Sequence, residues 1–154
     1  MTPDPQIPIY KMHPLIQKAY LSVHAWFDTQ PEIQGYEKFS YPNDTGRVLN
    51  RLDKRDAAFN FNYYFPTHFF KACHALESDQ VIGLEKLASW LRYNPYLTVV
   101  DVGCGDGAGS VAVIDALLKL RSENQIDSRP IQLFCVAVDP NINGLYIYDK
   151  MLSE

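Results

Sequence analysis

The chain has 154 residues, of which 47% are hydrophobic and 21% are charged, and its formal net charge is −4 at pH 7. This length suits one domain with a buried core, and the composition excludes a disordered chain. The negative charge gives no general attraction to nucleic acid, and no apolar run approaches the ~20 residues that a membrane span needs.

The cysteines and the N-terminal residues indicate in which cellular compartment the protein is expected and whether it binds a metal. Cys73, Cys104 and Cys135 are widely separated, without a CxxC pair. An odd number at such spacings argues against a disulfide framework and against a zinc site. Residues 1–12 contain three prolines, one acid and no arginine, unlike a secretory signal or a transit peptide. We therefore expect reduced thiols, no metal site, no membrane association and a cytoplasmic location, with an organellar matrix as the alternative.

Residues 1–94 are expected to form a mostly helical N-terminal segment. Apolar residues recur at helical spacing between His13 and Phe27, and Pro14 suits a first helical turn. Residues 28–46 are rich in turn formers, which indicates a loop.

An aromatic-rich stretch follows this loop, "RDAAFNFNYYFPTHFFKACHALES". Its aromatic residues are expected to lie mostly in the core, and Pro66 is expected to break it into two elements. Ser78 is expected to be the N-cap of a further helix that ends near residues 94–95.

In residues 95–154 the hydrophobic pattern is no longer that of helices alone. "YLTVVDVG" and "IQLFCVAVDP" are short apolar runs typical of buried strands, and "SVAVIDALLKLRSE" between them is helical. Strand, helix and strand form one βαβ unit, whose strands are parallel. The sequence thus predicts an α/β fold, with a helical N-terminal segment followed by the first βαβ unit of a Rossmann-like sheet.

The stretch "VVDVGCGDGAGS", residues 99–110, joins the first strand to the helix and contains four glycines within seven positions. Such a loop lets its backbone approach a ligand closely. No Gly-Lys-Ser/Thr follows, which excludes a Walker phosphate loop. A tight turn that only packs helix on strand explains one or two glycines, but not four with an acid at each end of the unit.

A dinucleotide site is a serious alternative, because Gly103, Gly105 and Ala108 satisfy the pattern G-x-G-x-x-A. Asp106 within the loop and Asp101 at the strand end count against it, since both carboxylates would repel a diphosphate. Both suit a ligand with a positive charge. S-adenosylmethionine is such a ligand, because it has an ammonium group, a sulfonium group and no phosphate.

"VVDVGCGDG" resembles the first motif of class I S-adenosylmethionine-dependent methyltransferases, and "VAVDPN" resembles their second, an acid that ends the next strand. The resemblance implies S-adenosylmethionine as cofactor, with Asp101 near its amino group and Asp139 accepting hydrogen bonds from its ribose hydroxyls. The loop backbone would contact the methionine part. The implied cofactor-binding residues are Asp101, Gly103, Cys104, Gly105, Asp106, Gly107, Asp139 and Pro140.

The aromatic-rich stretch also faintly resembles one branch of that family, the ribosomal small-subunit-associated methyltransferase-like proteins. The methyl acceptor is open between RNA, protein and a small molecule, and no catalytic residue is identified. A class I domain has more strands than the two found here, so we expect the N-terminal part of a sheet that is incomplete at its C-terminus. Two parallel strands alone should leave apolar surface and an edge exposed, and we expect a missing C-terminal half or a partner chain to complete them.

Two further residue types invite a chemical role. Cys104 is expected near a helix N-terminus, where a thiolate would be stabilised, although a small residue facing the cofactor is the interpretation we favour. His68 and His74 flank Cys73, but their spacing misses that of a metal pair on one helical face, so packing or surface positions are expected.

Three functions follow from these patterns. The first is a methyltransferase that uses S-adenosylmethionine. The second is a non-catalytic methyltransferase-like scaffold or ribosome-associated protein, and the third is a fragment of an NAD-dependent oxidoreductase.

Overall fold

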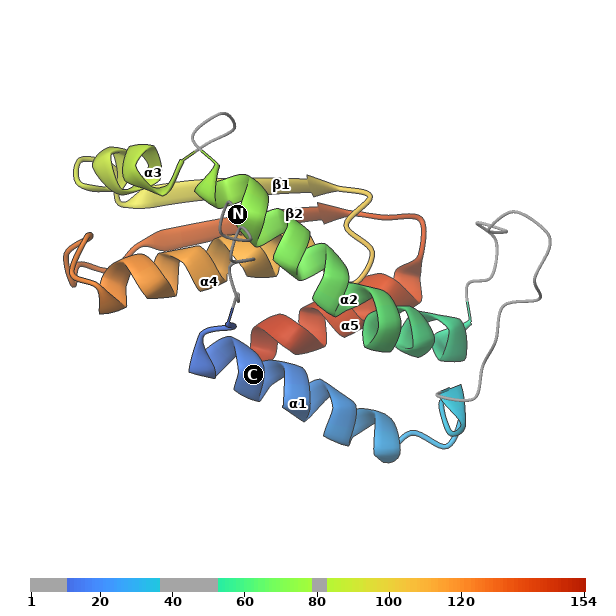
Figure 1. The fold of residues 1–154 in the computed structure, drawn as a ribbon. Coiled ribbons are helices and arrows are strands. Elements are labelled where there is room, and N and C mark those ends of the chain that lie inside the picture. The colour runs from blue at the N-terminus through green and yellow to red at the C-terminus, as the bar shows by residue number, and fades with distance from the viewer. Residues whose placement is uncertain (1–10, 37–52, 79–82) are drawn as a thin grey trace, which may run out of the picture.

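A computed structural model describes residues 11–36, 53–78 and 83–154 (Figure 1). Within these ranges the chain forms an α/β structure of five helices and two strands. In chain order they are α1 (Pro14–Asp28), α2 (Lys54–Glu77), α3 (Leu84–Leu91), β1 (Tyr96–Val102), α4 (Ala108–Ser122), β2 (Gln132–Val138) and α5 (Ile142–Ser153). The predicted loop 28–46 lies outside the described residues from position 37 onward.

Helix α1 begins as its sequence predicts, with Pro14 in the first turn and the His13 side chain accepting a hydrogen bond from the Leu15 backbone N–H. The His13 backbone N–H donates to Oδ1 of Asp115, a buried residue of α4, over 2.6 Å. A buried carboxylate needs such partners to offset its lost hydration. This bond therefore fixes the start of α1 against α4.

Helix α2 runs without interruption through Pro66, so the expectation that this proline ends an element is wrong. Proline removes one backbone hydrogen bond and crowds the preceding turn. Phe61, Phe65 and Phe69, at a spacing of four residues, are completely buried around it. Each buried aromatic side chain contributes about 2 kcal/mol, which together outweighs the cost of the proline.

Ser78 ends α2 and does not start the next helix, which corrects the predicted N-cap. Its backbone N–H donates to the His74 carbonyl over 3.1 Å, the bond that closes the last turn. The apolar stripe of α2 continues to Leu76, which is buried, so burial carries the helix up to Ser78. Helix α3 begins later, after Gly83.

Strands β1 and β2 are parallel, as predicted, with Tyr96 paired to Gln132 and Val102 paired to Val138. Helices α3 and α4 pack against one face, where Leu97 and Leu133 contact the cluster that includes Leu120. Both strands alternate between half-buried and exposed side chains, so they are not buried on both faces as their sequences suggest.

The other face of the sheet is apolar and exposed, which confirms the expectation for two strands alone. Its exposed apolar side chains are Tyr96, Val100, Val102, Phe134, Val136 and Val138. Among the described helices, none is both long and apolar enough to cross a membrane.

The carboxyl ends of the two strands lie side by side, and both arrows in Figure 1 point the same way. The loop that follows β1 leads into α4, and the loop that follows β2 leads into α5. Helix α2 packs against both α4 and α5. Two loops and one helix therefore surround the space beyond the strand ends.

Candidate functional site

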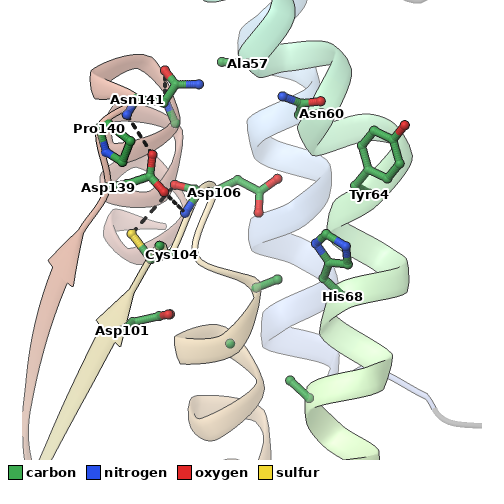
Figure 2. Close-up of a pocket in the computed structure, with 16 residues that line it drawn as sticks. Ala57, Asn60, Tyr64, His68, Asp101, Cys104, Asp106, Asp139, Pro140 and Asn141 are labelled. Atoms are coloured by element: carbon green, nitrogen blue, oxygen red, sulfur yellow. Dashed lines mark hydrogen bonds between the residues drawn. The ribbon is translucent and has the colours of Figure 1, made fainter. Parts of the chain in front are cut away.

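A cavity of about 830 Å³ lies at the carboxyl ends of the strands (Figure 2). One wall, here called the loop wall, is formed by residues of the two loops and the first turns of α4 and α5. The opposite wall, here called the α2 wall, is formed by one side of α2. The residues of the α2 wall are Ala57, Asn60, Tyr64, His68 and Ala72.

The structure brings together seven of the eight residues that the sequence motifs single out. They line the loop wall and are Asp101, Gly103, Cys104, Gly105, Asp106, Asp139 and Pro140. The eighth, Gly107, is the buried N-cap of α4 and does not line the cavity.

Gly107 is required by packing as well as by backbone conformation. Its φ of +86° lies in the left-handed region that favours glycine, and a Cβ atom there would overlap the Tyr148 ring. Gly144 in α5 has a similar role, because a Cβ atom there would lie 3.0 Å from the Gly105 carbonyl oxygen. These two glycines let α5 approach the loop wall closely.

Asp101 joins the end of β1 to the first turn of α4. Its Oδ2 accepts hydrogen bonds from the backbone N–H of Ser110 over 3.1 Å and from the Ser110 hydroxyl over 2.7 Å. These bonds satisfy one of the N–H groups that every helix start leaves without an intrahelical partner. Asp101 therefore stabilises the loop wall and also faces the cavity.

Asp139 joins the two loops to each other. Its Oδ2 accepts from the Gly105 backbone N–H over 2.8 Å, and its Oδ1 accepts from the Asn141 backbone N–H over 2.7 Å. The Asn141 side chain in turn accepts from backbone N–H groups at the start of α5. A carboxylate oxygen can accept two hydrogen bonds, so these contacts leave Asp139 able to accept further bonds from a ligand.

Asp106 points across the cavity toward α2 (Figure 2). Burial raises the pKa of its carboxyl to about 7, and the negative charges of Asp139 and Asp101 act in the same direction. Near neutral pH this group is therefore divided between its acid and carboxylate forms. The cavity lining contains these three aspartates and, among the described residues, no lysine or arginine.

Cys104 faces the cavity as a thiol. Burial raises its pKa, and the charges of Asp101 and Asp139 raise it further. Helix α4 begins only at Ala108, so Cys104 does not lie at a helix N-terminus that would stabilise a thiolate. The environment fits a small residue against a ligand better than a nucleophile.

The sequence interpretation missed the α2 wall. Residues 60, 64, 68 and 72 recur every fourth position, which places them along one side of a helix. The sequence predicts that the surrounding aromatic run is mostly core, which is correct for Phe61, Phe65 and Phe69 but not for the neighbouring face. The helical spacing was the available signal, and a predicted break at Pro66 concealed it.

His68 and Tyr64 stack on one another within the α2 wall, with ring centroids 6.0 Å apart and an interplanar angle of 23°. His68 is exposed, and so is His74. The prediction of packing or surface positions for these two histidines is confirmed, but His68 also lines the cavity.

Comparisons with family models, with curated proteins and with solved structures found no match to this chain.

Proposed function

We propose that the cavity binds S-adenosylmethionine and that the chain provides the cofactor-binding part of a methyltransferase. The observation that carries this proposal is the charge of the cavity, which has three aspartates and, within the described residues, no lysine or arginine in its lining. A diphosphate would be repelled there, whereas ammonium and sulfonium groups would be attracted.

The residues present fit the groups of this cofactor. Asp139 can accept hydrogen bonds from the two ribose hydroxyls in addition to the backbone bonds that it already accepts. Asp101 would attract the ammonium group, and the glycine loop would place its backbone against the methionine part. When bound, S-adenosylmethionine supplies an electrophilic methyl group.

The contribution of this chain to methyl transfer is positioning. Asp101 and Asp139 fix the loop wall through backbone hydrogen bonds, so the cofactor would meet a preformed surface. Methyl transfer asks for a nucleophile aligned with the sulfonium methyl group, and such alignment accounts for much of the rate gain. No residue is assigned as a catalytic base.

Calorimetric titration with S-adenosylmethionine, S-adenosylhomocysteine and NAD tests the proposal. We expect saturable binding of both sulfur nucleotides and none of NAD. Binding of NAD alone would overturn the proposal in favour of the dinucleotide alternative. A folded chain that binds none of the three would favour the non-catalytic scaffold.

A further inference from the structure

The α2 wall offers different chemistry from the loop wall. Along one side of α2, Asn60, Tyr64 and His68 follow one another at four-residue spacing, and we call them the α2 ladder. Figure 2 shows the three side chains on the far side of the cavity from Asp101 and Asp139. The polar groups that would hold the cofactor belong to the loop wall, so the α2 ladder faces the remaining space.

The cavity is large enough for more than the cofactor's polar ends. Sites for one drug-sized ligand have volumes of about 300–1,000 Å³, and this cavity, with about 830 Å³, lies toward the upper end of that range. If the polar ends of the cofactor lie against the loop wall, the part of this volume beside the α2 ladder is left for a second small group.

The α2 ladder presents flat aromatic surface and hydrogen-bonding groups. The Tyr64 and His68 rings lie nearly parallel, 6.0 Å apart, and Asn60 adds an amide one turn earlier. Aromatic rings favour offset stacking or edge contacts with another ring. An amide, a phenol and an imidazole can together donate and accept hydrogen bonds at the ring's edge.

Charge limits what can bind beside these rings. Asp106 points from the loop wall toward the α2 ladder, and Asp101 and Asp139 lie behind it. The described lining offers no lysine or arginine that could pair with a phosphate or a carboxylate. An anionic group would be repelled by these acids, whereas an uncharged ring would not.

We propose that the α2 ladder is the acceptor-binding wall of the cavity and that it binds an uncharged planar ring stacked against Tyr64 and His68. This inference rests on the proposed cofactor site, because the cofactor would occupy the loop wall opposite. Asn60 and Tyr64 bind the edge of the ring, and the imidazole of His68 covers its face.

Nicotinamide and nicotinate form a matched pair of probes, because they share one ring and differ mainly in the charge of its substituent at neutral pH. Their binding is measured by ligand-observed NMR with the chain saturated with S-adenosylhomocysteine. We expect nicotinamide to bind in the millimolar range and nicotinate to bind at least about tenfold more weakly.

Variants then locate the bound ring. His68→Ala changes an exposed side chain and should weaken nicotinamide binding about fivefold while leaving S-adenosylhomocysteine binding unchanged. Tyr63→Ala is the matched control, because Tyr63 is exposed on α2 but does not line the cavity. It should change neither affinity.

The outcomes separate this inference from the proposed function. If S-adenosylhomocysteine binds but nicotinamide does not, or nicotinate binds equally well, the ladder's role is overturned and the cofactor site stands. Equal nicotinamide affinity in the wild type and His68→Ala also overturns it. If S-adenosylhomocysteine does not bind at all, the proposed function fails, and this inference fails with it.

Discussion

The two walls of the cavity are built by different means. The loop wall is fixed by backbone groups, since Asp101 and Asp139 accept hydrogen bonds from the N–H groups of Ser110, Gly105 and Asn141. The α2 wall is fixed by packing, because the neighbouring face of that helix holds Phe61, Phe65 and Phe69 in the core. One wall of the cavity therefore depends on a few local residues, while the other depends on the position of a whole helix.

The largest expected effect concerns the loop wall. Gly107→Ala places a methyl group in the Tyr148 ring and forces a side chain into the left-handed backbone region. We expect the free energy of unfolding to fall by about 3 kcal/mol, from overlap and backbone strain together. Chemical denaturation measures this loss, and the remaining folded protein should bind S-adenosylmethionine poorly.

Gly35→Ala is the matched control for backbone strain alone. Gly35 has a similar φ of +82°, but among the described residues, its two chain neighbours apart, no atom lies within 4 Å of the position a Cβ would occupy. We expect a loss of about 1 kcal/mol there, from the backbone strain. Equal losses at the two glycines would show that contact with Tyr148 does not shape the loop wall.

The loop wall could be predicted from the sequence because its determinants are local. Seven of the eight residues taken from the two motifs line the cavity, since acids after parallel strands meet at one sheet edge. The parallel pairing of β1 and β2 followed from the same βαβ pattern. Cys104 shows the limit of a local prediction, because the pKa of its thiol is raised not only by Asp101 of the same motif but also by burial and by Asp139 on the other loop.

The α2 wall could not be predicted in the same way. Whether a residue such as Tyr64 faces the core or the cavity depends on how α2 packs against α4 and α5. The local sequence pattern does not determine this packing. The continuity of α2 through Pro66 likewise depends on tertiary burial of the neighbouring phenylalanines, which overrides the local preference. Residues outside the two motifs were therefore found only in the structure.

A second variant tests whether Asp139, which joins the two loops by hydrogen bonds, contacts the ligand in addition to stabilising the fold. Asp139→Ala removes the acceptors for the N–H groups of Gly105 and Asn141 and, on our proposal, those for the ribose hydroxyls. We expect S-adenosylmethionine binding to weaken by about 2 kcal/mol and stability to fall by about 1 kcal/mol. Asp149→Ala, which removes an exposed acid from α5, is the control for net charge. Unchanged affinity in Asp139→Ala would remove Asp139 from the ligand site.

The third prediction concerns pH and Asp106, the acid that points from the loop wall toward α2. The folded-state pKa of Asp106, about 7, lies above the ordinary value of 3.8. The folded chain thus binds this proton more tightly than the unfolded chain, so the stabilisation is present below about pH 4 and is lost as pH rises through 7. In denaturation experiments, the stability of the wild type should fall over this range relative to Asp106→Asn.

Ligand binding should respond to pH in the opposite direction. A cationic ligand favours the Asp106 carboxylate, so S-adenosylmethionine affinity should rise about tenfold between about pH 6 and pH 8 relative to that of Asp106→Asn. The other titratable and polar groups around Asp106 are the same in the wild type and in Asp106→Asn. They are Asp101, Asp139, Tyr20 and the α2 ladder. The ratio of the two affinities at each pH therefore isolates Asp106, and a constant ratio would contradict its role.

The smallest expected effect concerns the α2 wall, and it distinguishes the two walls most directly. Pro66→Ala restores a backbone N–H within α2 and removes the ring that crowds the preceding turn. Because the buried phenylalanines already hold the helix, we expect a gain of only about 1 kcal/mol in unfolding free energy. Thr67→Ala, an exposed change one position later, is the control for helix propensity.

We expect Pro66→Ala to affect nicotinamide binding more than S-adenosylmethionine binding. Asn60 and Tyr64 precede residue 66 and His68 follows it, so a small change in helix geometry moves the parts of the α2 ladder relative to each other. The loop wall is fixed by its own backbone bonds, so S-adenosylmethionine affinity should change by less than about twofold, whereas nicotinamide affinity should change more. If both affinities change equally, the two walls do not behave independently. A shift of α2 would then also move the loops, through the contacts that α2 makes with α4 and α5.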